Sequence, residues 1–147
     1  MKKTTLFLAA LFCMMMQTVS TFAGDKLITP EQLPATAMTF IQENFPGVAI
    51  SFAKKDFDNG RRNYEVHLNN GVELDFDKKG NWDKVDCQYN PVPAHIVPAH
   101  IADYVKATYP GTEIVKIDKE RYGYKIELSN DLELKFNKKG MLFDIDD

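Results

Sequence analysis

Residues 64–87 read YEVHLNNGVELDFDKKGNWDKVDC, and residues 124–147 read YKIELSNDLELKFNKKGMLFDIDD. Ten of the 24 aligned positions are identical, where average residue usage would give roughly one or two. In both stretches apolar and polar residues alternate, which is typical of β-strands with one buried face and one solvated face. Asn70-Gly71 lies between two alternating runs and is a strong hairpin signal. These stretches therefore predict antiparallel strands joined by tight turns.

A second pair of matching segments precedes these strands. Residues 33–50 read LPATAMTFIQENFPGVAI, and residues 97–114 read VPAHIADYVKATYPGTEI. Each segment has apolar residues spaced for one face of a helix, and each ends in aromatic-Pro-Gly, which stops a helix. The offset between the copies is 64 residues here but 60 residues in the strands. We therefore expect the first copy to carry four extra residues in the Asp56–Arg62 loop.

These patterns predict an α+β fold built as a tandem repeat of a helix plus a four-stranded antiparallel meander. Both helices are expected to pack on one face of a continuous antiparallel sheet, and the first strand of the first copy is expected near Ile50–Phe57. The predicted organisation is a signal peptide over 1–23, one repeat over 24–87, a linker over 88–93 and a second repeat over 94–147. A unit of about 55–60 residues is marginally stable alone, so the repeats should pack together.

The N-terminal segment has the order of a secretory signal peptide. Lys2 and Lys3 precede an apolar run over 6–16, and Thr21-Phe22-Ala23 supplies small residues for a cleavage site. The apolar run is too short for a good membrane span. Cys13 lies inside this run after Phe12, rather than at the cleavage point, which argues against a lipoprotein signal. We therefore expect a periplasmic or secreted protein with no membrane span in its mature chain.

Charge and cysteine content narrow the range of partners. Removal of residues 1–23 would change the formal net charge from −3 to −5, because Lys2 and Lys3 leave. A mildly acidic protein is a poor candidate for binding nucleic acid, so no such partner is expected.

Cys87 would be the remaining cysteine. Its phase in the alternation places it in the core, which favours an inert thiol over a nucleophile activated by His67.

The motifs that resemble metal sites fail on spacing. Asp56-Phe57-Asp58-Asn59-Gly60 lacks the glycine and the glutamate of an EF-hand loop at their required positions, so a polar hairpin tip is favoured. His95 and His100 are five residues apart and separated by Pro98, unlike a metal-binding pair on one helical face. We therefore expect no catalytic activity, no cofactor and no bound metal.

The motifs above resemble PepSY-type domains. The resemblance is carried by Phe45-Pro46-Gly47, Tyr64-Glu65-Val66, Asp75-Phe76-Asp77 and Gly80, with Tyr109-Pro110-Gly111, Tyr124-Lys125-Ile126, Phe136-Asn137 and Gly140. It covers nearly all of residues 30–147, and the duplicated, exported form is similar to PepSY-like proteins described as β-lactamase-inhibitor-like. These are turn and core residues, which specify a fold better than an activity. The resemblance implies a non-catalytic periplasmic module that binds or inhibits another molecule.

The alternation leaves a polar sheet face as the candidate binding surface. The predicted partner-binding residues are Glu65, His67, Glu73, Asp75, Trp82 and Lys84. An exposed tryptophan among charges suits a binding hot spot, although Trp82 could instead cover the edge of the core. Two functions remain open. The chain could bind a protein or peptide partner of the cell envelope through this face, or it could be a structural, envelope-assembly domain that self-associates.

Export provides the first test. We expect mass spectrometry of the exported protein to find an N-terminus at or near Gly24, because Ala23 ends the predicted cleavage site. Retention of residues 1–23, or a lipid attached to Cys13, would contradict the signal-peptide interpretation.

Overall fold

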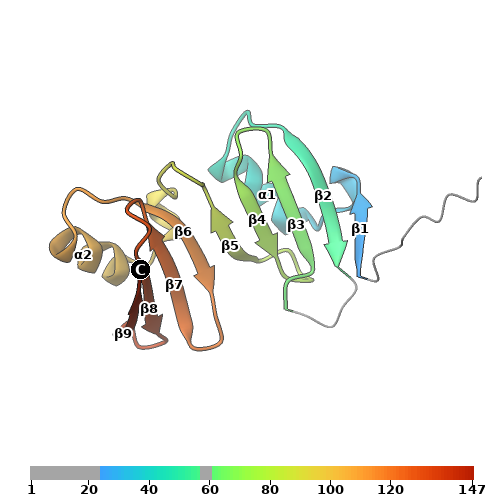
Figure 1. Cartoon of the computed structure of the whole chain (residues 1–147). Coiled ribbons are helices and arrows are strands. Elements are labelled where there is room, and N and C mark those ends of the chain that lie inside the picture. The colour runs from blue at the N-terminus through green and yellow to red at the C-terminus, as the bar shows by residue number, and fades with distance from the viewer. Residues whose placement is uncertain (1–23, 57–60) are drawn as a thin grey trace, which may run out of the picture.

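The computed structural model describes residues 24–56 and 61–147, and in these residues the strands form a single nine-stranded sheet. Neighbours in the sheet follow the order of the chain, from β1 to β9, and every neighbouring pair is antiparallel. Figure 1 shows the strongly twisted sheet running across the molecule, with β1 near one end and β9 at the other. The predicted signal peptide lies outside the described residues, as does most of the predicted loop insertion.

The described chain alternates short helical segments with runs of strands. The first part contains β1 (Asp25–Ile28), the 3₁₀ helix η1 (Pro30–Gln32), α1 (Ala35–Asn44), β2 (Ile50–Asp56), β3 (Tyr64–Leu68), β4 (Glu73–Phe76) and β5 (Trp82–Asp86). The second part contains η2 (Ala94–Ile96), α2 (Ala99–Thr108), β6 (Ile114–Lys119), β7 (Gly123–Leu128), β8 (Glu133–Asn137) and β9 (Leu142–Asp146).

One row of directly opposed apolar residues crosses the whole sheet. We call it the central apolar row, and it consists of Ile28, Ala53, Val66, Leu74, Val85, Ile117, Ile126, Leu134 and Ile145. The members from Ala53 to Leu134 are at most 1% exposed. Directly opposed residues of neighbouring strands lie on the same face of a sheet. The row therefore defines the core face from one edge to the other.

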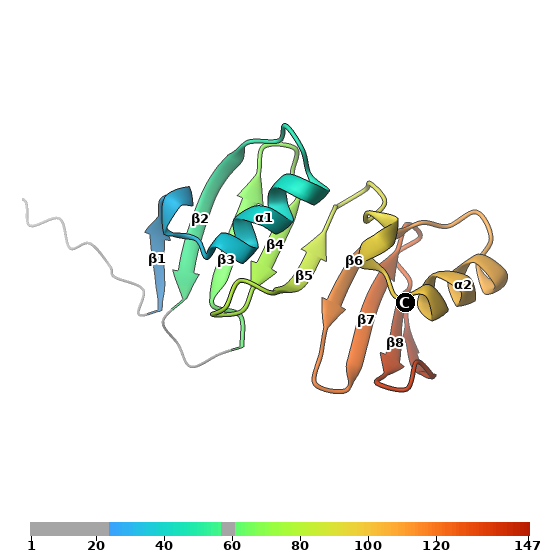
Figure 2. The same cartoon turned by 180° about the vertical axis from the view of Figure 1, so that it is seen from behind.

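The two α-helices pack against this face through edge-to-face aromatic contacts. Phe40 of α1 meets Phe76 with ring centroids 5.7 Å apart, and Tyr104 of α2 meets Phe136 at 5.5 Å. Figure 2 shows α1 lying across the strands of the first part of the sheet. Ile41 and Ile101 are at most 3% exposed and belong to the same core cluster as the central apolar row. The helices and the sheet thus share one continuous core.

The predicted fold class is wrong. The described residues form one nine-stranded antiparallel sheet with two α-helices of ten residues each, so the fold is mostly β rather than a tandem α+β repeat. β1, which the sequence analysis did not anticipate, pairs with β2 and adds a ninth strand. Hydrogen bonding also continues from β5 to β6 across the predicted linker. The sheet, rather than a helix-plus-meander unit, is therefore the structural unit.

Asp131 replaces the hairpin glycine without changing the turn. Gly71 has φ +88° and Asp131 has φ +67°, so both lie in the left-handed region. The Leu68 amide donates to the Val72 carbonyl at 2.9 Å, and the Leu128 amide donates to the Leu132 carbonyl at the same distance. Aspartate is one of the few side chains that tolerate this conformation. The two hairpins therefore close in the same way.

Substitution of Gly80 by alanine tests the contact between the start of α1 and the β4–β5 turn. A β-carbon on Gly80 would lie 2.7 Å from Pro34 Cβ and 2.9 Å from the Ala37 nitrogen, and φ is +86°. At Gly47 φ is +76°, but a β-carbon would meet nothing within 4 Å. We expect Gly47→Ala to cost about 1–2 kcal/mol of unfolding free energy from backbone strain alone. Gly80→Ala should cost about 1–3 kcal/mol more, because it also overpacks the helix start. Equal costs in denaturant unfolding would contradict this contact.

Candidate binding surfaces

The face opposite the helices carries two rows of polar side chains. The first charged row, in strand order from β2, is Lys54, Glu65, Asp75, Lys84, Asp118, Lys125, Lys135 and Asp144. The second charged row is Phe52, His67, Glu73, Asp86, Lys116, Glu127, Glu133 and Asp146. Opposite charges on adjacent strands stabilise a sheet, and like charges destabilise it. Ion pairs nevertheless join neighbouring strands of this face, including Lys84 with Glu73, Lys116 with Asp86 and Lys135 with Asp144.

Phe52 is the first member of the second charged row and carries no charge. Its ring is stacked on His67 with centroids 4.2 Å apart, and it is 38% exposed. His67 forms a short hydrogen bond to Glu65, and its other ring nitrogen lies 3.7 Å from Glu73. Burial tends to raise the pKa of Glu65, but the His67 hydrogen bond and the Lys54 charge hold it below its usual value. The result is an exposed aromatic ring stacked on a histidine that two carboxylates flank, with the Lys54 ammonium 5.4 Å from the ring centroid.

Asp75 belongs to a buried ion-pair cluster rather than to the solvated surface that the alternation predicted. It is 6% exposed and lies 3.3 Å from Arg62 and 3.5 Å from Lys84. The same Arg62 guanidinium donates to Asp118 at 2.8 Å, so it links β4 to β6. Burial raises the pKa of Asp75 by more than Lys84 and Arg62 lower it. Arg62 covers this carboxylate, which explains why an alternating position is buried.

Trp82 lies on the helix face, so its predicted place beside Lys84 on the polar face is wrong. The pairing of β4 with β5 is irregular between Asp75 and Phe76, and Trp82 lies opposite Phe76 of the core. Its ring is 6.3 Å from Phe40 of α1, with the Lys119 ammonium 3.7 Å above it. A β-bulge adds a residue to one strand and reverses the face that follows. Trp82 therefore covers the edge of the core, as the alternative interpretation held.

The structure brings together four of the six predicted residues. Glu65, His67, Glu73 and Lys84 lie on the polar face of β3 to β5, where Phe52 is opposite His67 and Lys84 is 3.6 Å from Glu73. Asp75 shares this face but is buried, and Trp82 is on the other side. Sequence reasoning missed Phe52 because its face depends on an irregular pairing between Ile50 and Phe52. Irregular strand pairing therefore explains both why Trp82 was assigned to the wrong face and why Phe52 was not predicted.

Cys87 is 3% exposed, and burial raises the pKa of its thiol to about 11. A thiol needs a lowered pKa to act as a nucleophile near neutral pH. His95 forms a short hydrogen bond to the Asn44 side chain of α1, and the ring of His100 lies against Gly140. These residues therefore have identifiable packing contacts within the fold.

Residues 24–56 and 61–147 contain no group of three or more His, Cys, Asp or Glu side chains arranged to hold a metal ion. No helix in this part of the chain has the length and apolar content needed to cross a membrane.

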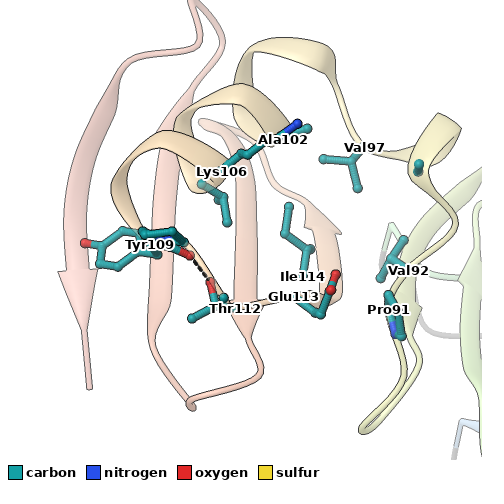
Figure 3. A pocket seen from close by; sticks show the side chains of 13 residues that line it. Pro91, Val92, Val97, Ala102, Lys106, Tyr109, Thr112, Glu113 and Ile114 are labelled. Carbon is teal, nitrogen blue, oxygen red and sulfur yellow. Dashed lines mark hydrogen bonds between the residues drawn. The ribbon is translucent and has the colours of Figure 1, made fainter.

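A groove of about 550 Å³ lies between α2 and the segment that follows β5. Figure 3 shows Val92 and Val97 on one side, Ala102 and Lys106 of α2 on the other, and Ile114 between them. Pockets of roughly 300–1,000 Å³ with mainly apolar linings commonly bind small molecules or side chains. This groove could accept an apolar group beside the polar ends of Lys106 and Glu113.

A family model described as "Putative beta-lactamase-inhibitor-like, PepSY-like" matches residues 62–144, more than half of the 147-residue chain. A search of curated proteins found no match.

Solved structures of three proteins from Bacteroides species are similar over 84% of this chain. A "putative periplasmic protein" of the DUF2874 family from Bacteroides vulgatus is 41% identical, with a TM-score of 0.79 and 97% of its chain covered. A "putative calcium-regulated periplasmic protein" from Bacteroides thetaiotaomicron is 42% identical, with a TM-score of 0.78 and 97% covered. A "putative periplasmic protein of unknown function" from Bacteroides vulgatus is 34% identical, with a TM-score of 0.79 and 100% covered.

The buried carboxylate predicts a pH effect of definite sign. Because the pKa of Asp75 is raised in the folded protein, the stability linked to its protonated form is lost as pH rises through that pKa. We therefore expect the stability of Asp75→Asn, relative to the unsubstituted protein, to improve as pH rises from about 3 to 7. Unfolding free energies from denaturant titrations at several pH values measure this difference.

Asp77→Asn is the matched control with the opposite sign. Burial tends to raise the pKa of Asp77, but hydrogen bonds from Asn81 and Lys79 hold it below its usual value. Its ionised form is therefore favoured by folding, and that stability is lost as pH falls through the folded pKa. The relative stability of Asp77→Asn should worsen as pH rises. Parallel trends for the two variants would contradict this account of Asp75.

Proposed function

This chain belongs to the PepSY-like family, and we propose that it is a periplasmic binding module that holds a polypeptide partner on its open sheet face. The descriptions of the similar structures as periplasmic support this location, together with the signal-peptide pattern of residues 1–23. The partner in this proposal is a protein or peptide of the cell envelope. Inhibition of an enzyme would be one consequence of such binding.

The observation that carries the proposal is the partly exposed Phe52 ring on the polar face, which is stacked on His67 and has the Lys54 ammonium 5.4 Å from its centroid. Phe52 is supported from below by His67, and Glu65 and Glu73 flank His67. An aromatic ring attracts a cation placed over its face, and nearby carboxylates pair with that cation. Aromatic anchors surrounded by polar groups are typical of binding hot spots. This arrangement suits a lysine or arginine side chain presented by the partner.

Binding rather than catalysis is the activity we propose. Cys87 is the nucleophile that the sequence offers most directly, but it is buried in the core and its pKa is raised. His67, its possible base, lies on the opposite face of the sheet beside Phe52. A nucleophile and its base must lie within hydrogen-bonding reach. These two residues are therefore not assigned a catalytic role.

One similar structure is described as calcium-regulated, but we do not propose this property for the present chain. A hollow of about 240 Å³ is lined by the carboxylates of Asp25, Asp56, Glu65 and Asp75, but Lys54 and Arg62 also line it. Lys54 lies 3.6 Å from Glu65, and Arg62 lies 3.3 Å from Asp75. Calcium takes six to eight oxygen ligands, which such cation-paired carboxylates do not offer. The residues of this hollow do not fit a calcium ion.

Phe52→Ala tests the proposed surface. We expect it to weaken partner binding by about 2 kcal/mol or more, the usual cost of truncating an aromatic hot spot. The unfolding free energy should change by no more than about 1 kcal/mol, because the ring is partly exposed and contributes mainly its stack on His67. The measurement compares the amount of the same partner retained from envelope extract by tagged mature protein with and without the substitution.

Tyr89→Ala is the control, because Tyr89 is a 94% exposed aromatic residue in the turn after β5. It should retain the partner at the unsubstituted level. A partner lost with Lys106→Glu, at an exposed residue of the α2 groove, but indifferent to Phe52→Ala would place the contact in that groove instead. Retention of only a second copy of the chain would favour the self-associating alternative.

A further inference from the structure

β9 ends the sheet of the described residues and pairs on one side only, with β8. Met141, Phe143 and Ile145 lie on or just before β9 and are 57%, 53% and 48% exposed. Phe143 also meets Tyr122 edge-to-face, with ring centroids 5.2 Å apart. Natural edge strands are usually short, charged or covered, because an open edge can pair with another strand. This edge is unusually apolar for one that is open.

All three rows of the sheet reach β9 and stop there. The central apolar row ends in Ile145, and the two charged rows end in Asp144 and Asp146. Ile145 is 48% exposed, whereas its opposed neighbour Leu134 is fully buried. The amide of Ile145 donates to the Asp144 carboxylate at 3.1 Å, a local contact that a strand carbonyl could replace. The edge thus presents an aliphatic side chain between two carboxylates.

β9 itself carries two carboxylates, Asp144 and Asp146, and no basic residue. Lys135 pairs with both Asp144 and Asp146, and these contacts raise its pKa. Glu133 lies directly opposite Asp146, so two like charges face each other at the end of the second charged row, and Lys125 lies 3.3 Å from Glu133. Like charges opposed across a ladder are unfavourable, and an added cation relieves them. A second β9 would instead bring further aspartates to the same place.

The junction between β5 and β6 shows which residues a neighbouring strand offers in this sheet. Val85 of β5 faces the aliphatic Ile117, while Lys84 faces Asp118 and Asp86 faces Lys116. Each charge therefore meets its opposite, and the apolar residue meets an apolar residue. The same rule applied to β9 calls for a basic residue opposite Asp144, an aliphatic one opposite Ile145, and a basic one opposite Asp146.

We propose that β9 binds an extended partner segment with alternating basic and aliphatic residues, which adds a tenth, antiparallel strand to the sheet. Backbone hydrogen bonds to the open edge supply affinity, and the alternate side chains supply specificity. The aliphatic side chain would extend the central apolar row beside Ile145. β9 is at the far end of the strand order from β2, which carries Phe52, so this surface is distinct from the one proposed above.

The test uses a fluorescein-labelled peptide, Gly-Lys-Val-Lys-Val-Lys-Gly, with the full mature protein. We expect saturable binding by fluorescence anisotropy, and about tenfold or greater loss with Asp146→Lys, which reverses one charge of the edge. A peptide with glutamate in place of lysine should bind this variant better than the unsubstituted protein. Phe52→Ala should leave binding of the lysine peptide unchanged, so a failed sheet-face proposal would not affect this result.

Asp103→Lys makes the same charge change at an exposed position of α2 and should leave binding unchanged. Equal losses for the two variants would mean non-specific attraction and would overturn the proposal. Absence of saturable binding, or binding that survives Asp146→Lys, would also overturn it. So would a dimer of the unsubstituted protein, by light scattering, that Asp146→Lys dissociates, because the occupant would then be a second copy. Changes in the NMR chemical shifts of backbone amides on addition of the lysine peptide, if confined to β9, would support the proposed site.

Discussion

The central apolar row is the constraint on which the rest of this structure depends. Side chains alternate between the faces of a strand, so one residue of slip would move a whole strand's apolar set into solvent. Every member of this row from Ala53 to Leu134 is almost fully buried. The helices α1 and α2 cover the same face through Phe40 and Tyr104. The position of every polar side chain on the other face follows from this register. The candidate binding surfaces are therefore consequences of how the core is aligned.

The charged rows act mainly within the protein. Arg62 is the clearest case, because one guanidinium reaches both Asp75 of β4 and Asp118 of β6 across β5. A buried charge is costly unless it is paired, and removal of one partner exposes that cost. Such pairs favour one register over its alternatives. The two places proposed to contact a partner are the partly exposed Phe52 ring and the open edge of β9.

Sequence alternation predicted the strands well where the pairing is regular. It placed Val66 and Leu74 in the core, and Glu65, His67 and Glu73 on the other face. It failed at Trp82 and overlooked Phe52, because irregular pairings beside them change the face of a side chain without an obvious mark in the sequence. The burial of Asp75 depends on Arg62, thirteen positions earlier in the chain, and could not be read from local alternation. β1 has only four residues, too few for a clear period, so the predicted fold class lacked the ninth strand.

The strict order of the nine strands has a consequence for how the chain folds. Each strand pairs only with the strands immediately before and after it in sequence, so most connections are short, and longer ones occur only where α1 separates β1 from β2 and α2 separates β5 from β6. Folding rates fall as contacting residues become more distant along the chain, and sheets with distant pairings are the slow ones. Here each new hairpin can add to an edge that has already formed. A chain that is synthesised from its N-terminus could therefore assemble its sheet strand by strand, with each new strand adding to the edge formed by the strand before it.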